Sequence, residues 1–486
     1  MKTIFEMSVA GRCAVALPRL DTPKAEPLPK DLLREEGSIG LPEVTEGEVM
    51  RHFIGLSSLN YHVDKGMYPL GSCTMKYNPK HNENVARMPG LAGLHPLVPD
   101  GMAQGTLRIM RRLQDYLCEI TGFDGVTLEP AAGAQGELCG LLLIRAYHIS
   151  RGDLNRIEVL MPDSAHGTNP ATSTLAGCRV VGVKSNELGE VDPEDLKAKA
   201  GPNTAAFMLT NPNTLGIFES RIHELTAIVH EAGGLNYMDG ANMNALLCVA
   251  RPADMGFDVC HLNLHKTFST PHGGGGPGAG PVGCTKALIP FLPDPVVAGD
   301  PDGDCRLERM SATFGKLLAF QGNVGILYRA YAYIRSIGAK GLREVSENAL
   351  INANYMKARL KGHFDIPYDH GPCMHEFVLS GARQAAKGVK TLDMAKRLLD
   401  YGFHAPTVYF PQIVHEAMMI EPTETEGLED LDAFVDALLS ILREVEEKPH
   451  LVTDAPVNTP VLRLDEVTAV KELCLVEPWG DAGSGS

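Results

Sequence analysis

The sequence lacks the features of several large protein classes. It has no apolar run that approaches the length of a membrane span, and its first seven residues, with an early acid and no apolar segment, resemble neither a secretory signal nor a transit peptide. Eleven scattered cysteines without a C-x-x-C pair favour reduced thiols over a disulfide scaffold. With 60 acidic and 44 basic residues, the formal net charge of -16 argues against binding to nucleic acid or to an anionic membrane. We therefore expect a cytoplasmic protein with no nucleic-acid partner and no membrane association.

Two glycine-loop motifs of common enzymes are also missing. A phosphate-binding P-loop requires G-x-x-x-x-G-K-[ST], and no stretch fits it, because Lys266 precedes the glycines of residues 273–278. His272 beside these glycines resembles the oxyanion loop of esterases, but the nucleophile elbow G-x-S-x-G that such enzymes need is absent. The sequence therefore favours neither chemistry.

What is present is the composition of an ordinary globular protein, with 486 residues, 44% hydrophobic and 21% charged, enough for two or three domains. Short apolar runs alternate with amphipathic helical patterns, which favours an α/β domain with a largely parallel sheet. The expected strands are residues 157–161, 179–184, 205–210, 235–238, 259–264 and 281–284, and the expected helices are 105–122, 138–149, 192–200 and 222–232.

The patterns predict four parts along the chain. Residues 1–95 are rich in proline and glycine and are expected to form an arm that wraps another surface. Residues 96–340 form the large domain, 341–450 a smaller α/β domain, and 451–486 an irregular tail whose last residues are mobile. The remaining expected elements are one or two long helices within 311–360, strands at 373–379 and 417–420, and helices at 391–402 and 428–444.

Polar clusters follow the expected strands at residues 163–170, 210–214, 239–242 and 265–266. Ligands of such sheets bind at the carboxyl ends of the strands, so we expect these clusters to form a site. In the last cluster, Lys266 ends the apolar run 259–264. A lysine at the end of a core strand is costly unless its pKa falls or it is neutralised covalently, as in a Schiff base with a carbonyl cofactor. On this stretch alone, a surface lysine at a strand end explains the pattern equally well.

The strand-end groups together supply what a pyridoxal phosphate site requires. Lys266 can form the Schiff base, and Asp239, at the end of an earlier strand, can pair with the pyridine nitrogen and keep the ring an electron sink. Singly, each group has an ordinary structural explanation, but the ordered set does not. The other expected cofactor contacts are His166 over the ring, the helix start at Ala132, Gly133 and Ala134 for the phosphate, Thr210 and Asn211 for the phenolic oxygen, and Ala241 and His265 beside the aspartate and the lysine.

Five stretches carry a resemblance to a known family. The chain resembles the carboxyl-terminal, catalytic half of glycine decarboxylase, the P-protein of the glycine cleavage system, in the form split over two polypeptides. The resemblance covers nearly the whole chain, and the stretches occur in family order: Tyr68–Pro79, Glu129–Glu137, Asp163–Ala171, Asp239–Ala245 and Asn263–Phe268.

The resemblance implies the fold type I, aspartate aminotransferase-like architecture, with pyridoxal 5'-phosphate as cofactor and Lys266, His166 and Asp239 as catalytic residues. It also implies an oxidoreductase that decarboxylates glycine and transfers the aminomethyl group to the lipoyl group of a carrier, the H-protein. A homologous subunit 1 is implied as partner, in a heterodimer or a heterotetramer. For the glycine carboxylate, the candidates are Thr74, Lys76 and Tyr77 in the arm, or His265.

Two alternatives remain at this point. The chain could catalyse another fold type I reaction, as an aminotransferase or an amino-acid decarboxylase that needs no carrier. It could also be a noncatalytic scaffold subunit, although the joint presence of Lys266, Asp239 and His166 argues against that.

Overall fold

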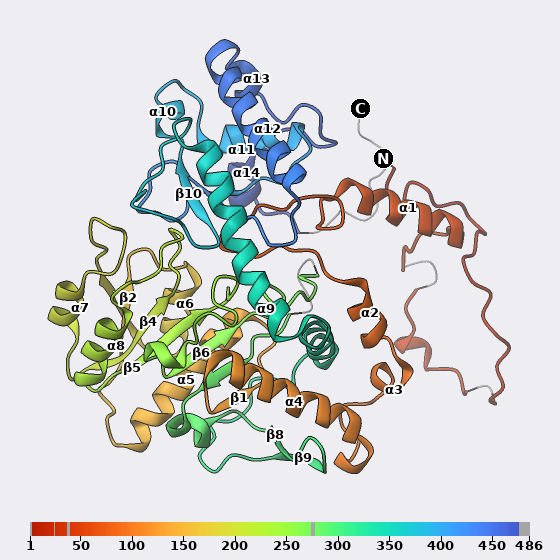
Figure 1. Ribbon diagram of the computed structural model, residues 1–486. Coiled ribbons are helices and arrows are strands. Elements are labelled where there is room, and N and C mark those ends of the chain that lie inside the picture. The colour runs from red at the N-terminus through yellow and green to blue at the C-terminus, as the bar shows by residue number, and fades with distance from the viewer. Residues whose placement is uncertain (1, 24, 36–38, 274–277, 476–486) are drawn as a thin grey trace. The chain divides into compact units, whose positions relative to one another are not determined.

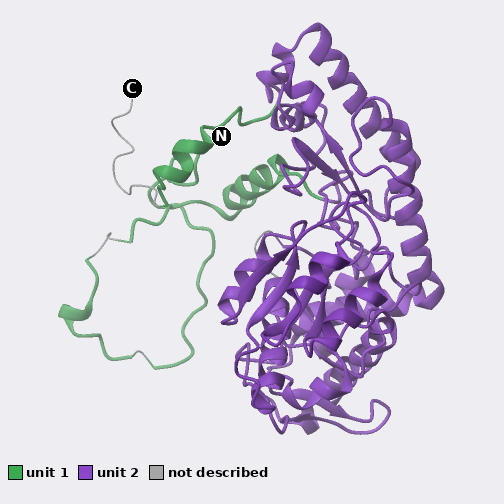
Figure 2. Cartoon of the chain, turned by 90° about the vertical axis from the view of Figure 1, so that its left-hand side faces the viewer, with its two compact units in different colours: residues 1–62, 459–486 green, residues 63–458 purple. Residues whose placement is uncertain are grey.

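The computed structural model describes residues 2–23, 25–35, 39–273 and 278–475. Two compact units are distinguished by their internal contacts, residues 1–62 with 459–486 and residues 63–458, which are coloured separately in Figure 2. Residues 63–95, which we predicted as part of the arm, belong to the larger unit. The end of the predicted tail, residues 476–486, lies outside the described residues.

The smaller unit contains short helices joined by extended chain. Helix α1 (Glu46–Leu59) begins with a capping box, in which the Thr45 side chain and Glu48 each satisfy a backbone N–H of the other. This S/T-x-x-E pattern is visible in the sequence, so a helix in the expected arm was predictable. The other elements of this unit are η1 (Lys30–Leu32) and α14 (Glu466–Lys471).

A mostly parallel sheet forms the centre of the larger unit. Among the described residues it has seven strands in the order β1-β7-β6-β5-β4-β2-β3, and β7 alone runs against its neighbours. This confirms the α/β architecture expected from the sequence. The strands are β1 (Gly125–Thr127), β2 (Glu158–Pro162), β3 (Arg179–Val183), β4 (Thr204–Thr210), β5 (Leu235–Gly240), β6 (Val259–Leu262) and β7 (Val282–Cys284).

Helices pack against this sheet (Figure 1), and one of them approaches it unusually closely. In α5 (Gly133–Ser150), a Cβ atom on Gly140 would lie 2.2 Å from Cε2 of the buried Tyr237 on β5, so only glycine fits there. This close packing fixes the start of α5 against the sheet. The other elements of the large domain are α4 (Gln104–Thr121), α6 (Thr168–Leu175), α7 (Pro193–Lys199), α8 (Ile222–Glu231), η2 (Asp100–Met102), η3 (Ala253–Met255), η4 (Lys286–Phe291), β8 (Val296–Gly299) and β9 (Cys305–Glu308).

Helix α9 (Val324–Leu360) joins the large domain to a smaller α/β domain (Figure 1), since it contacts α4 in one and α12 in the other. It kinks at Gly338, whose φ of 63° is left-handed. The smaller domain contains an antiparallel sheet in the order β10-β12-β11. Its elements are β10 (Phe377–Ser380), α10 (Ala382–Ala385), α11 (Thr391–Asp400), β11 (Thr407–Val408), β12 (Ala417–Ile420), α12 (Leu428–Glu447) and α13 (His450–Thr453).

The segment before the large domain runs along this smaller sheet. Leu70 forms a β-bridge with Ile420, and a Cβ atom on Gly71 would lie 2.2 Å from the Met419 side chain. This contact holds Ser72 beside the large sheet's carboxyl edge. Two further short helices, α2 (Lys80–Ala86) and α3 (Pro89–Ala92), follow in the last part of the segment that we predicted as an arm. No helix within the described ranges has an apolar stretch long enough to cross a membrane.

Candidate active site

A cavity of about 220 Å³ lies at the carboxyl ends of β4, β5 and β6. Eight of the sequence-predicted residues line it, and the other lining residues include Ser72 from the arm, Glu137 from α5, and His375 and Glu376 just before β10. The predicted residues that it brings together are Gly133, Ala134, His166, Thr210, Asp239, Ala241, His265 and Lys266. The glycine-rich loop after Lys266 belongs to the same prediction, but its residues 274–277 lie outside the described residues.

Lys266 follows β6 and is partly buried. Its ammonium donates a hydrogen bond to the backbone carbonyl of Ser72 at 2.9 Å. Ser72 is one of the few non-glycine residues with a left-handed backbone, at φ 60°, a conformation that is frequent at functional sites. The lysine amine is thus held inside the cavity by the segment that packs on the smaller sheet.

Asp239, at the end of β5, is the buried anion of the site. Its carboxylate accepts hydrogen bonds from the Ala241 N–H and from the Asn169 amide, both at 3.0 Å, and lies 3.4 Å from His261 Nε2. Burial would raise the pKa of Asp239, but His261 and these two donors outweigh it and hold the pKa below its usual value. Asp239 is therefore ionised and available to a cation in the cavity.

Glu137 lies next to this aspartate on α5, and its environment has the opposite effect. Burial, and then the charge of Asp239, raise the pKa of Glu137 to about 7, although Thr168 donates a hydrogen bond to it at 2.8 Å. The hydroxyl of Thr168 also lies 2.9 Å from Nδ1 of His166, whose pKa is lowered by burial. The histidine ring is thus neutral and is held in place by a polar chain that runs through Thr168 to Glu137.

The start of α5 is suited to bind an anion. No side chain caps this end of the helix, so its first N–H groups and the positive end of the helix dipole face the cavity. A Cβ atom on Gly133 would lie 2.4 Å from Asn263 Oδ1, so the helix start and the end of β6 approach as closely as glycine allows. Asn263 Oδ1 and His265 Nδ1 are buried and have no hydrogen-bond partner among the described residues. This unsatisfied pair indicates a polar ligand.

Five predicted residues lie outside the described cavity lining. Lys76 is buried and forms an ion pair with Glu424 at 2.6 Å, and its ammonium donates to Tyr333 at 3.1 Å. The side-chain oxygen of Asn211 accepts from the Glu219 N–H at 3.0 Å, so it stabilises a turn. The other three are Ala132, which precedes the helix, Thr74, which donates to Glu421 behind the wall, and Tyr77, which is exposed.

Sequence reasoning also missed residues that line the cavity. Ser72 and Glu137 lie inside stretches that matched the family, so a signal existed for them. His375 and Glu376 immediately precede β10 in the smaller domain, where the sequence carries no marked polar cluster. His261 lies within β6, whose other residues are apolar, so the sequence marked this strand as core and not as part of the site.

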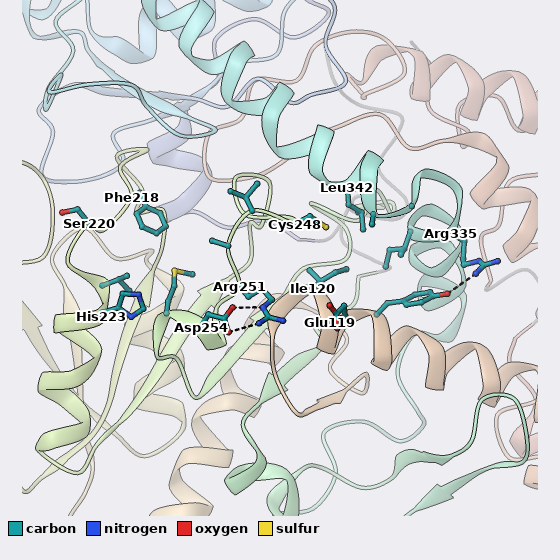
Figure 3. A pocket seen from close by; sticks show the side chains of 18 residues that line it. Glu119, Ile120, Phe218, Ser220, His223, Cys248, Arg251, Asp254, Arg335 and Leu342 are labelled. Carbon is teal, nitrogen blue, oxygen red and sulfur yellow. Dashed lines mark hydrogen bonds and ion pairs between the residues drawn. The ribbon is translucent and has the colours of Figure 1, made fainter.

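A larger cavity of about 910 Å³ lies elsewhere in the same unit (Figure 3). Three of its charged side chains, Arg251, Asp254 and Arg335, have partners within the lining. Arg251 donates to Asp254 at 2.7 and 3.1 Å, and Arg335 donates to the hydroxyl of Tyr116 at 3.3 Å. None of the predicted site residues is among the described residues of its lining, so we assign no reaction to it.

Comparison with known proteins decides the family. A family model described as "Glycine dehydrogenase, C-terminal domain" matches residues 345–461. The "Probable glycine dehydrogenase (decarboxylating) subunit 2" of Halalkalibacterium halodurans is 57% identical over 472 residues, and these cover 96% of both chains. The protein of the same name from Chloroherpeton thalassium is 57% identical over 97% of this chain and 96% of its own.

The chain belongs to the glycine dehydrogenase (decarboxylating) subunit 2 family.

Solved structures support the fold of this family member. A crystal structure of "glycine decarboxylase (P-protein) of the glycine cleavage system, in inhibitor-bound form" superposes with a TM-score of 0.70 at 22% identity, over 85% of this chain and 93% of the other. The Lactobacillus brevis glutamate decarboxylase gives a TM-score of 0.64 at 14% identity, over 92% and 98%. These likenesses confirm the fold type I architecture that the sequence resemblance implied.

The Lys76–Glu424 ion pair yields a test of its structural role. Replacing Glu424 by Gln leaves the Lys76 ammonium buried without a counter-charge, and we expect a loss of about 3 kcal/mol in the free energy of unfolding. Chemical denaturation of the purified chain measures this loss. Glu344→Gln removes the acid of the exposed Lys340–Glu344 pair and should cost less than about 1 kcal/mol. Equal, small losses in both variants would show that Lys76 does not depend on Glu424.

Proposed function

We propose that this chain is the catalytic subunit that decarboxylates glycine with pyridoxal 5'-phosphate and transfers the aminomethyl group to the lipoyl group of an H-protein. The observation that carries the proposal is Lys266 with its ammonium in a cavity that also contains the ionised Asp239 and an uncapped helix start. Membership of the family supports the same assignment, since its members are named as decarboxylating glycine dehydrogenases.

The residues present fit the cofactor. Lys266 would hold its carbonyl carbon, the N–H groups at Gly133 and Ala134 its phosphate, and Asp239 its ring nitrogen. His166 would lie against the ring, and Thr210 lines the cavity for the phenolic oxygen. When bound, pyridoxal phosphate supplies an electron sink for the pair of electrons that carbon dioxide leaves behind.

The charges of the cavity favour loss of the glycine carboxylate. Among the described residues that line it, Lys266 is the only lysine, and there is no arginine that could form an ion pair with that carboxylate. His375 lines the cavity with both ring nitrogens unpartnered, and burial lowers its pKa to about 3, so it is a neutral donor. We assign the carboxylate to His375 and to backbone near Ser72. A weakly held carboxylate leaves as carbon dioxide more easily than one in an ion pair.

Partners follow from the family. Its members are named as subunit 2, and we infer a homologous subunit 1 that completes a heterodimer or heterotetramer. A lipoylated H-protein would deliver its disulfide to the mouth of the cavity, and the buried walls of the cavity would limit water until it arrives. We infer that the assembly acts in the cytoplasm.

Replacing Lys266 by Ala should abolish the reaction. Without the amine, the variant should release carboxyl-labelled carbon dioxide from glycine at least about 100-fold more slowly than the wild type, in assays that contain the partner subunit and lipoylated carrier. The exposed Lys286, changed to Ala, should leave the rate near normal. Full activity of the Lys266 variant would remove the proposal.

Asp239→Asn should separate cofactor binding from turnover. The amide keeps the size of the side chain but not its charge, so we expect the cofactor to bind while the rate falls about 100-fold. Equilibrium dialysis of the cofactor and the release of labelled carbon dioxide measure the two effects. Asp258→Asn changes a carboxylate that accepts from the Asn236 N–H at the other end of the strands, and serves as the control. Near-normal turnover in Asp239→Asn would show that the ring nitrogen needs no anion.

A further inference from the structure

Two buried glutamates form a pair at the wall of the cavity. Strands β10 and β12 are antiparallel with Phe377 opposite Ile420, so Glu376 and Glu421 lie opposite each other at the adjacent position. Their side chains are 3% and 1% exposed. Carboxylate oxygens of the two residues and a ring nitrogen of His375 all lie within 4.8 Å of one another. The strand register therefore places two acids together beside the reaction site.

Neutral groups donate hydrogen bonds to this pair, and not all of its atoms are satisfied. Glu376 accepts from the Ser72 N–H at 2.6 Å, and Glu421 accepts from the Asn242 amide at 2.7 Å and from the Thr74 hydroxyl. Glu421 Oε2 and both ring nitrogens of His375 are buried and have no hydrogen-bond partner among the described residues, although His375 Nε2 lies 3.8 Å from Glu376 Oε1. A carboxylate oxygen of Glu421 and the neutral imidazole of His375 are therefore left without hydrogen bonds beside the cavity.

The charged and titratable groups around the pair do not neutralise two carboxylates. Lys266 approaches from the end of β6, Cys73 from the arm and Glu424 from the loop after β12. Burial and then Glu421 raise the pKa of Glu376 well above its usual value, and burial raises that of Glu421 to about 7, against hydrogen bonds that lower it. At neutral pH the pair therefore retains at least one proton.

Ser72 connects the pair to the lysine. Its N–H donates to Glu376, and its carbonyl accepts from the Lys266 ammonium at 2.9 Å. The left-handed backbone of Ser72 is what allows one residue to contact both groups. Ser72 alone therefore separates the Lys266 ammonium from the carboxyl group of Glu376.

We propose that Glu376 and Glu421 share a proton and that Glu376, which lines the cavity, is the acid that protonates the sulfur released from the carrier disulfide. This inference rests on the proposed function and adds a further catalytic residue to it. Three observations support the assignment. Glu376 lines the cavity, whereas Glu421 does not line it and accepts a hydrogen bond from Thr74. Ser72, which contacts Glu376, also accepts a hydrogen bond from Lys266.

The reaction requires one proton at that sulfur. When carbon dioxide leaves glycine, the remaining electron pair forms a bond from the α-carbon to one sulfur of the cyclic disulfide. The S–S bond breaks and its electrons pass to the second sulfur, so the carbon is oxidised and the disulfide is reduced by two electrons. The second sulfur becomes a thiol by taking the shared proton, and solvent restores that proton after the product leaves.

The test uses the complete assembly with partner subunit, cofactor and lipoylated carrier. Glu376→Gln and Glu421→Gln are compared with the wild type for the release of labelled carbon dioxide and the appearance of carrier thiol, from pH 6 to 9 and in heavy water. We expect the wild-type rate to fall as the pH rises through the pKa of the pair, because the protonated form is the acid. Each variant should lose this pH dependence and the solvent isotope effect, and should be about 100-fold slower near pH 7.

Glu426→Gln is the matched control. Glu426 lies on the loop after β12, as Glu421 does, and is partly buried. Burial raises its pKa to about 7, but it does not line the described cavity. Its change should leave the pH profile intact. The cofactor absorbance of each variant checks that the site has assembled.

Four results would overturn the proposal. Variants that are slower by the same factor at every pH, with an unchanged isotope effect, would show a structural role. A metal ion bound stoichiometrically in the wild type and lost in Glu421→Gln would show a cation site instead. A wild-type assembly that releases no carbon dioxide from glycine would refute the proposed function, and the acid role with it, whereas an active wild type with unaltered variants refutes the acid role alone.

Discussion

The electrostatic balance around Lys266 is the constraint on which the rest of the site depends. One lysine ammonium faces Asp239, Glu137, Glu376 and Glu421, all of them buried. Only Asp239 has a lowered pKa, because His261 and two hydrogen-bond donors stabilise its charge, while burial raises the pKa of the other three. Protons rather than cations therefore balance the remaining carboxyls. A site of this kind can hold a cationic ring at one end and exchange a proton at the other.

The part of the site that lies on the large sheet was predictable from the sequence. The carboxyl ends of parallel strands meet at one edge, so polar residues after separate apolar runs had to converge, and His166, Asp239 and Lys266 do so. Most expected strands agree with the structure within two residues, because apolar runs of that length between turns have few other solutions. Strand β1 was missed, because Gly125–Thr127 contains a single aliphatic residue, Val126.

The part that depends on packing between distant segments was not predictable. The ammonium of Lys76 could bind a carboxylate ligand, and we predicted that it does. In the structure it pairs instead with Glu424, which is 348 residues away in the sequence. The Asn211 side chain was expected to reach a ligand and instead supports a turn eight residues on. Glu376 and Glu421 meet only through the register of β10 with β12, which no local pattern encodes. The tertiary structure thus determines which of the chemically suitable residues line the site and which stabilise the fold around it.

The most direct test of the account is an absorbance spectrum of the purified chain supplied with pyridoxal phosphate, alone and mixed with its partner subunit, before and after the addition of glycine. We predict a visible band from the cofactor held on Lys266, and a shift of that band when glycine enters the cavity. If neither sample shows a band, Lys266 does not hold the cofactor, and the chain is a noncatalytic subunit of its assembly.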